Sequence, residues 1–238
     1  MQIITFSPSP STEGLFNPPL LASSILPEWY VKCSAFTTGK FEVDSFSGQY
    51  NGTVKKCMPV LDEMLAGYII TLDSDIYVEQ SVNNNRSNIT WAYHNPHFPI
   101  IGTHQPAQLG GLYIPPEYSP HPYKWNNYWV IKTPPGHSCL FRHPFYHNTK
   151  EPFFSLPAMV DTDKHATNIH FPFLLKQGFW GIIPKGTPVI QIIPFMRQDW
   201  KMKVSSGVDT NAVKQWHEAA KEYVNKYKKH FRTTKRWM

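Results

Sequence analysis

The stretch from Tyr128 to Trp200 decides the fold class of this chain. It reads YWVIKTPPGHSCLFRHPFYHNTKEPFFSLPAMVDTDKHATNIHFPFLLKQGFWGIIPKGTPVIQIIPFMRQDW. β-Branched and aromatic residues gather in short runs between Pro- and Gly-containing turns, and the runs cover residues 128–132, 138–141, 181–183 and 187–195. Short strand-like runs of this kind are typical of a compact all-β sheet or barrel. The sequence therefore predicts a mainly β single domain, β-clip or barrel-like, built around an acidic turn.

The rest of the chain divides by composition. The 238 residues have a net charge of +6, yet residues 201–238 hold ten Lys and Arg residues against three Asp and Glu, a net of +7. All 22 prolines lie within residues 1–200. We therefore expect a β-rich body over residues 1–204, with residues 94–125 as a long irregular loop. A basic helix over residues 205–238 should follow and pack on the body or on a neighbouring subunit.

Periodicity predicts the other elements. Apolar residues at helical spacing after Pro59 indicate one short internal helix over residues 58–66. Two strands should follow it, over residues 68–72 and 76–79, joined by an acidic turn at residues 73–75. Residues 7–27 are rich in Pro and Ser and should form an extended surface loop. The tail should form an amphipathic helix that buries an apolar face; this face comprises Val213, Trp216, Ala220, Tyr223, Tyr227 and Phe231.

Two classes of protein are disfavoured by the sequence. No run approaches the roughly 18 apolar residues of a membrane-spanning helix, and the first residues do not form a secretory signal. Three widely spaced cysteines fit a reducing compartment and form no zinc-binding pattern. We therefore expect a cytoplasmic protein that does not contact a membrane.

The acidic turn supplies the candidate catalytic residues, Asp161 and Asp163. Two carboxylates two residues apart point the same way on a strand, and they can share a proton, a water molecule or a cation. A polar turn at the end of a strand is the structural alternative. Cys139 lies in an alternating strand and should belong to the core rather than act as a nucleophile.

The segment around these carboxylates resembles the dUTPase and dCTP deaminase superfamily. The similar pieces are residues 158–163 (AMVDTD), residues 185–193 (KGTPVIQII) and the turn at residues 133–137 (TPPGH), within about 65 residues. The resemblance implies a β-clip fold and a nucleotide ligand accompanied by Mg²⁺. It also implies that Asp161 orients water or a sugar hydroxyl. Substrate contacts would come from Arg142, Gln191 and Lys164.

The chain departs from the superfamily pattern at three places. An Arg follows the strand at residues 138–141, but the Ser-Gly of the phosphate motif does not. No Tyr stands near Lys164 or His165 to stack on a base, and the basic tail replaces a glycine-rich lid. The resemblance therefore implies the scaffold more directly than the hydrolytic activity.

A second likeness extends over most of the chain. Residues 57–62 (CMPVLD), residues 67–68, residues 131–136 (IKTPPG) and residues 194–195 resemble an uncharacterised family of phage and bacterial proteins. This likeness brings no activity with it. It implies a phage-like source, with the host cytoplasm or the virion as the location.

Eleven histidines suggest a metal site as another alternative. Two histidines and a carboxylate at one end of a β-barrel can bind non-haem iron. His143, His147 and His165 are the candidate histidines, with Asp161 or Asp163 as the carboxylate. The opposing interpretation is that these imidazoles lie at the surface or form ordinary hydrogen bonds.

Three classes of function therefore follow from the sequence. The body is a small-molecule or nucleotide-binding protein, perhaps hydrolytic; or the chain is a phage-type structural or interaction protein; or histidines hold iron for an oxygenase-like reaction. We expect a homo-oligomer. The basic tail would contact nucleic acid or an acidic protein, with a solvated helix face as the simplest alternative.

Overall fold

The computed structural model describes residues 2–80, 87–91, 95, 97–147, 151–165 and 167–238. The chain forms two compact units. Unit 1 comprises residues 1–22 and 67–197, and unit 2 comprises residues 23–66 and 198–238. The sequence predicts a continuous body over residues 1–204, so the grouping of residues 23–66 with the tail differs from that expectation.

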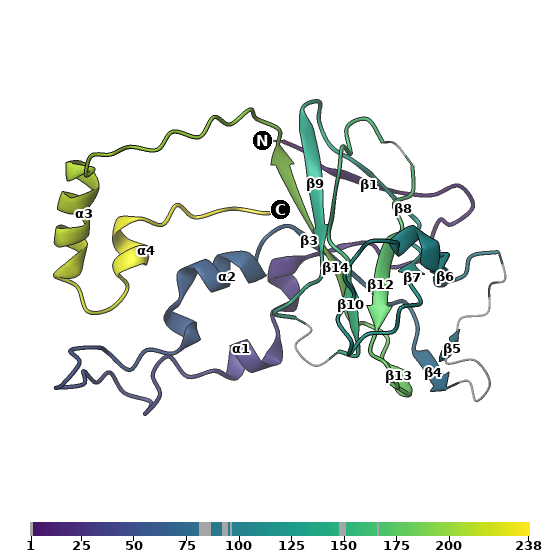
Figure 1. Cartoon of the computed structure of the whole chain (residues 1–238), viewed down its shortest axis with the longest axis horizontal. Coiled ribbons are helices and arrows are strands. Elements are labelled where there is room, and N and C mark those ends of the chain that lie inside the picture. Colours follow the sequence, from purple (N-terminus) through teal and green to yellow (C-terminus); the bar gives the residue numbers. More distant parts are fainter. Residues whose placement is uncertain (1, 81–86, 92–94, 96, 148–150, 166) are drawn as a thin grey trace. The chain divides into compact units, whose positions relative to one another are not determined.

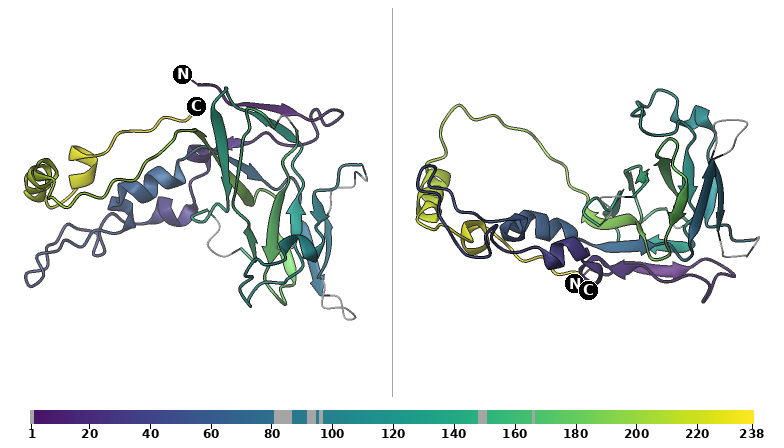
Figure 2. Two further views of the ribbon diagram at one scale, coloured as in Figure 1. Left: turned by 45° about the horizontal axis from the view of Figure 1, so that its top comes forward. Right: turned by 90° about the horizontal axis from the view of Figure 1, so that it is seen from below.

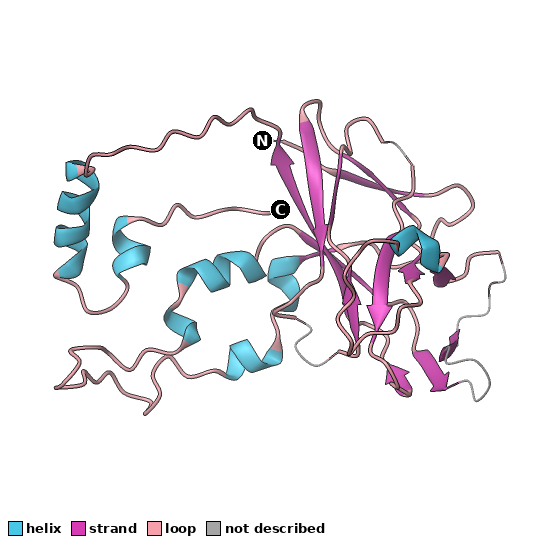
Figure 3. Cartoon of the chain, viewed as in Figure 1, coloured by secondary structure: helices cyan, strands magenta, loops and turns pink. Residues whose placement is uncertain are grey.

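The regular secondary structure described in unit 1 is mainly strand (Figures 1 and 3). They are β1 (Thr5–Pro8), β2 (Leu20–Leu21), β3 (Tyr68–Thr71), β4 (Ile76–Gln80), β5 (Ser87–Trp91), β6 (Ile101–Thr103), β7 (Tyr123–Trp125), β8 (Trp129–Lys132), β9 (His137–Arg142), β10 (Phe153–Ser155), β11 (Ala158–Val160), β12 (Phe171–Leu175), β13 (Gly181–Ile183) and β14 (Pro188–Met196). The mainly β prediction is confirmed.

Every named pair of neighbouring strands is antiparallel. The sheets have the strand orders β11-β9-β14-β3-β2, β10-β12-β7-β6, β13-β4-β5 and β1-β8. The nine-residue strand β14 lies in the middle of the first sheet, beside β9 and β3 (Figure 2). The strands that the structure describes form separate sheets and do not close into a barrel, so the barrel-like form of the prediction is not observed.

The core of unit 1 is rich in aromatic rings that come from different strands. Trp125 of β7 stacks on Phe173 of β12 with ring centroids 3.7 Å apart, and Phe153 of β10 meets Trp125 edge to face. Alternate residues of β9, Cys139 and Phe141, enter the same core. Because strand side chains alternate between faces, Ser138, Leu140 and Arg142 lie on the opposite face of β9.

Gly67 permits a close approach of two strands in unit 1. It precedes β3 and has a φ angle of +70°, a conformation that favours glycine. A Cβ atom at this position would overlap the carbonyl oxygen of Ile192 in β14. The pairing of β3 with β14 therefore depends on the absence of a side chain at residue 67.

The α-helices among the described residues belong to unit 2 (Figure 3). They are α1 (Glu28–Lys32), α2 (Met58–Met64), α3 (Thr210–Ala220) and α4 (Lys226–His230), with short 3-10 turns at η1 (Ala22–Ile25) and η2 (Val54–Lys56). The internal helix predicted over residues 58–66 is α2. No helix in the described part of the chain is long and apolar enough to span a membrane.

The tail differs from the single amphipathic helix predicted for it. Asn225 adopts a left-handed conformation with a φ angle of +62° and separates α3 from α4. Trp216, Tyr223 and Tyr227 are 64%, 58% and 39% exposed, so they do not form the buried face that their spacing predicts. Arg232 instead anchors the end of the chain, because its guanidinium lies 2.6 Å from Asp62 of α2.

The segment predicted as an irregular loop over residues 94–125 is more regular than expected. It contains β6, the 3-10 turn η3 (Pro106–Leu109) and β7, while residues 94 and 96 lie outside the described part. Its strands are only three residues long, which leaves too little alternation for a sequence pattern to reveal them.

Candidate functional site

The two candidate catalytic carboxylates lie in a hydrogen-bonded cluster beside β9. Arg197, which follows β14, holds Asp163 with two guanidinium nitrogens at 2.8 and 2.5 Å. Arg197 Nη1 also lies 3.2 Å from Asp161 Oδ1, to which Ser138 Oγ donates a hydrogen bond at 2.6 Å. The backbone N–H of Gly136 donates to Asp163 at 2.8 Å. These five residues are called the Arg197 cluster below.

The Arg197 cluster favours the ionised form of both carboxylates. The bond from Arg197 holds the pKa of Asp163 well below its usual range, and the bond from Ser138 lowers the pKa of Asp161. A carboxylate with a lowered pKa is a weak general base. One that already binds a guanidinium is also poorly placed to hold Mg²⁺, so the cluster does not fit the implied metal. The Asp161 side chain is 54% exposed and that of Asp163 is only 7% exposed. This burial favours a structural role for Asp163, in which it holds Arg197 in place.

The three predicted substrate-binding residues do not form one site. Arg142 and Gln191 face each other across β9 and β14, and Arg142 Nε donates to Gln191 Oε1 at 3.2 Å. Gln191 is fully buried. Ser138, the partner of Asp161, lies four residues from Arg142, which corresponds to about 13 Å along a strand. Lys164 is exposed in the turn after Asp161. The structure therefore forms two separate polar pairs on one face of this sheet.

The three candidate histidines differ in burial and in the contacts that they make. Nδ1 of the buried His143 accepts a hydrogen bond from the backbone of Ser155 at 3.3 Å, and the imidazole packs 5.0 Å from the ring of Phe154. His147 is partly exposed and His165 is exposed. In the described ranges, no three His, Cys, Asp or Glu side chains are placed to hold a metal ion. These residues therefore do not fit the iron site suggested by the sequence.

Cys139 is a core residue, as the alternating pattern predicts. It is fully buried, and burial raises the pKa of its thiol to about 11. Thr162 Oγ1 donates a hydrogen bond to its sulfur at 3.4 Å. A thiol of this kind is not ionised near neutral pH and does not act as a nucleophile.

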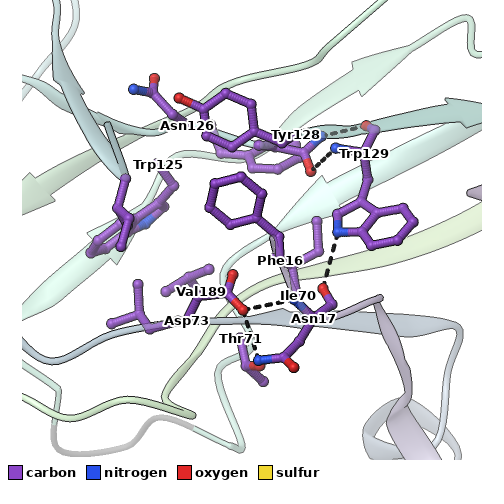
Figure 4. A pocket seen from close by; sticks show the side chains of 14 residues that line it. Phe16, Asn17, Ile70, Thr71, Asp73, Trp125, Asn126, Tyr128, Trp129 and Val189 are labelled. Carbon is purple, nitrogen blue, oxygen red and sulfur yellow. Dashed lines mark hydrogen bonds between the residues drawn. The ribbon is translucent and has the colours of Figure 1, made fainter. Parts of the chain in front are cut away.

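A different part of unit 1 has the features of a small-molecule site. A cavity of about 30 Å³ lies beside the end of β3 and the segment that joins β7 to β8 (Figure 4). Its aromatic walls include Trp125, Tyr128 and Trp129. The Asn127 side chain fixes this segment, because it both accepts a hydrogen bond from the backbone of Trp129 and donates one to it. A cavity of this size holds one or two water molecules.

Asp73 supplies the charged group of this cavity. Both hydrogen bonds to its carboxylate go to Oδ1: the backbone and the side-chain nitrogens of Asn17 donate at 2.8 and 2.7 Å. Oδ2 accepts no hydrogen bond from the part of the chain that the structure describes. Burial raises the pKa of Asp73, although the bonds from Asn17 and the charge of Lys185 oppose this effect. Oδ2 of Asp73 can therefore accept a hydrogen bond from a further N–H donor.

Phe16 and Asn17 cover the cavity. The Phe16 ring stacks on Tyr128 with centroids 4.5 Å apart and an angle of 14° between the planes. Figure 4 shows this ring between the Tyr128 ring and the Asp73 carboxylate. Trp129 Nε1 donates to the Asn17 carbonyl oxygen at 3.0 Å. The flanking residues 13–15 and 18 are exposed, so Phe16 and Asn17 belong to a surface segment.

Sequence reasoning missed this arrangement. It treated Asp73 as part of an acidic turn and residues 16–17 as part of a surface loop. Both descriptions hold locally, since only Leu72 separates Asp73 from the end of β3. An acidic residue close to the end of an apolar, strand-like run is the same signal that singled out Asp161. The contact between Asn17 and Asp73 spans 56 residues, and no local pattern indicates it.

Comparisons with known proteins do not assign the chain to a family. No protein-family model matches it, and no curated protein matches it. Inferences about function therefore rest on the geometry described above.

Proposed function

We propose that unit 1 is a small-molecule-binding module whose ligand is a planar ring with N–H donors. The observation that carries the proposal is the Asp73 carboxylate, which lines an aromatic-walled cavity. Its Oδ2 atom accepts no hydrogen bond from the described residues. Ligand sites commonly combine apolar and aromatic walls with a few polar groups that fix the orientation of the ligand.

The covering segment indicates what the ligand would look like. Phe16 presents a flat ring to Tyr128, and Asn17 presents two N–H donors to Asp73. A ligand that replaced both residues would stack on Tyr128 and donate hydrogen bonds to the carboxylate. Because the cavity holds only one or two waters in its present state, residues 13–19 must move for such a ligand to enter.

Nucleobases have the required shape and donors, in keeping with the nucleotide ligand suggested by the sequence. Guanine presents its ring N–H and its amino group side by side, which matches the two oxygens of a carboxylate. Uracil presents one ring N–H on its pairing edge. We therefore expect guanosine to bind more tightly than adenosine, cytidine or uridine.

Isothermal titration calorimetry with the four nucleosides tests this proposal. The wild type should bind guanosine best, and Asp73→Asn should weaken binding at least about tenfold, because loss of one charge-assisted hydrogen bond costs about 1.5–3 kcal/mol. Asp161→Asn is the matched control, since it removes a carboxylate from the same unit but not from this cavity. Equal binding by the wild type and Asp73→Asn, or no binding of any nucleoside, would contradict the proposal.

Nucleotide hydrolysis at Asp161 is the second candidate function. Its support is that Asp161 is half exposed, accepts a hydrogen bond from Ser138, and shares a sheet face with Arg142 and Gln191. Pyrophosphate or phosphate release from a panel of deoxynucleoside triphosphates with Mg²⁺ tests this function. Release that Asp161→Asn abolishes and Asp73→Asn leaves intact would favour it over the Asp73 cavity.

A further inference from the structure

Unit 2 contains a second and larger concavity. Its volume is about 570 Å³, which lies within the usual range of ligand sites, about 300–1,000 Å³. Three segments line it: residues 48–50, Lys56 at the end of η2, and residues between the end of α3 and α4. The interruption of the tail helix at Asn225 shapes this concavity, since Asn225 is itself one of the lining residues.

The lining of this concavity is basic and aromatic. Its charged residues are all lysines and its aromatic residues are all tyrosines; they are Lys56, Lys226, Lys228, Tyr50, Tyr223 and Tyr227. No Asp or Glu among the described residues lines it. Side chains from both parts of unit 2 thus place positive charge and flat rings on one hollow surface.

The nearby acidic side chains do not compensate this charge. Glu222 pairs with Lys229 at 2.7 Å, and Glu218 pairs with Lys221 at 2.6 Å. Asp44 lies outside the lining, and its carboxylate accepts hydrogen bonds from backbone N–H groups in its own turn.

Two of the three lysines of α4 remain available to a ligand. Lys226 and Lys228 are exposed, and neither forms an ion pair within the described part of the chain. Over the whole of unit 2, fourteen Lys and Arg residues stand against nine Asp and Glu, a net of +5. The concavity therefore lies in the more basic of the two units.

Phe41 contacts two of the tyrosine rings, and two of the rings are exposed. Phe41 lies 6.4 Å from Tyr50 and 6.5 Å from Tyr223 between ring centroids. Tyr223 is 58% exposed and Tyr227 is 39% exposed, so both present ring surface to solvent. Exposed aromatic faces beside lysines are the combination that binds single strands, because bases stack on the rings while cations neutralise the phosphates.

We propose that this concavity binds single-stranded nucleic acid. The lysines account for an anionic ligand, and the exposed rings favour one with unpaired bases over an acidic peptide. A duplex keeps its bases stacked on one another and does not present their faces. This inference is independent of the Asp73 cavity, because it concerns other residues in the other unit.

Fluorescence anisotropy with labelled twelve-nucleotide oligo-dT tests the proposal on the full chain. Tyr223→Ala should weaken binding about 5- to 150-fold, the usual effect of losing a stacked base. The double variant Lys226→Ala/Lys228→Ala should reduce the slope of log K against log salt by about 1.4, because each phosphate contact on a single strand contributes about 0.7. Tyr223→Phe keeps the ring and should bind like the wild type.

The matched control is the double variant Lys201→Ala/Lys203→Ala. These two lysines are exposed in the same unit and lie outside the concavity, so their loss should change the salt slope far less. Equal losses in the two double variants would show that diffuse charge drives binding and would overturn the proposal. Tighter binding of a twelve-base-pair duplex than of the single strand would overturn it as well, as would the absence of binding to oligo-dT at low salt. Because the four lysines are exposed, their variants should fold normally.

Discussion

At the scale of single residues, Asp73 and Asp163 show how surroundings separate two carboxylates of one unit. Asp163 is held by Arg197, and its pKa is lowered. Asp73 lies against aromatic walls, and burial raises its pKa. The first carboxylate is therefore satisfied by the protein, while Oδ2 of the second accepts no hydrogen bond from the residues that the structure describes. Sequence alone gives both the same description, an acidic residue at the end of a strand.

The pKa of Asp73 predicts an unusual pH dependence. A raised pKa in the folded state means that Asp73 stabilises the fold at acid pH and that this contribution is lost as the pH rises through the raised value. Asn17 can still donate to the amide oxygen of an Asp73→Asn variant. We therefore expect Asp73→Asn to melt at the same temperature as the wild type or higher at pH 7.

Thermal melts of the two proteins between pH 4 and pH 7 measure this difference. The advantage of Asp73→Asn should shrink toward pH 4, where the wild-type carboxyl becomes protonated. A variant that melts well below the wild type at pH 7 would show that the carboxylate is needed for stability rather than for a ligand.

Gly67 provides a second prediction at this scale. Both Gly67→Ala and Gly186→Ala place a Cβ atom on a residue with positive φ, which costs about 1–2 kcal/mol. Only the Cβ atom at residue 67 would overlap a neighbour, since nothing lies within 4 Å at residue 186. Gly67→Ala should therefore lower the free energy of unfolding more than Gly186→Ala in urea denaturation. Equal losses would show that β3 and β14 do not approach as closely as described.

At the scale of elements, several strands and the internal helix could be predicted from the sequence, whereas other strands and the break in the tail helix could not. The run at residues 181–183 coincides with β13, and the run at residues 187–195 overlaps all but one residue of β14. β10 and β12 were not predicted, because a run such as β12 is apolar at every position and does not alternate with polar residues. The helix break at Asn225 was missed because Tyr223 and Tyr227 continue the helical spacing across it.

The aromatic core supplies the prediction at this scale. Phe173 of β12 is fully buried and stacks on Trp125, so Phe173→Ala should lower the free energy of unfolding by about 3–5 kcal/mol. Phe145→Ala removes a ring that is 60% exposed in the same unit and should cost no more than about 0.5 kcal/mol. Urea denaturation measures both values. Similar costs for the two variants would be inconsistent with this core.

At the scale of the whole molecule, the charge follows the division into two units. Unit 1 has nine Lys and Arg residues against eight Asp and Glu, whereas unit 2 has a net charge of +5. Residues 198–209 lead into α3 without helix or strand, and Trp200, Met202 and Val204 on this segment are more than 80% exposed. The expected homo-oligomer stays a prediction, and these apolar side chains are where a neighbouring copy would be sought.

Limited proteolysis tests the composition of unit 2. Trypsin should cut first after Lys201 or Lys203, which are exposed and outside regular structure. The carboxyl-terminal fragment should nevertheless stay bound, because Arg232 contacts Asp62 at 2.6 Å with both side chains largely buried. Asp62→Asn should release the fragment during size-exclusion chromatography. Release of the fragment from the nicked wild type would contradict the pairing of the tail with residues 23–66.

The crystal structure of the full chain with guanosine is the most direct test of the proposed ligand site. The proposal predicts the base stacked on Tyr128 in the place of the Phe16 ring, with Asn17 displaced and both Asp73 oxygens accepting hydrogen bonds from the base. A structure in which Phe16 and Asn17 keep their contacts, with the nucleoside absent or bound elsewhere, would contradict it.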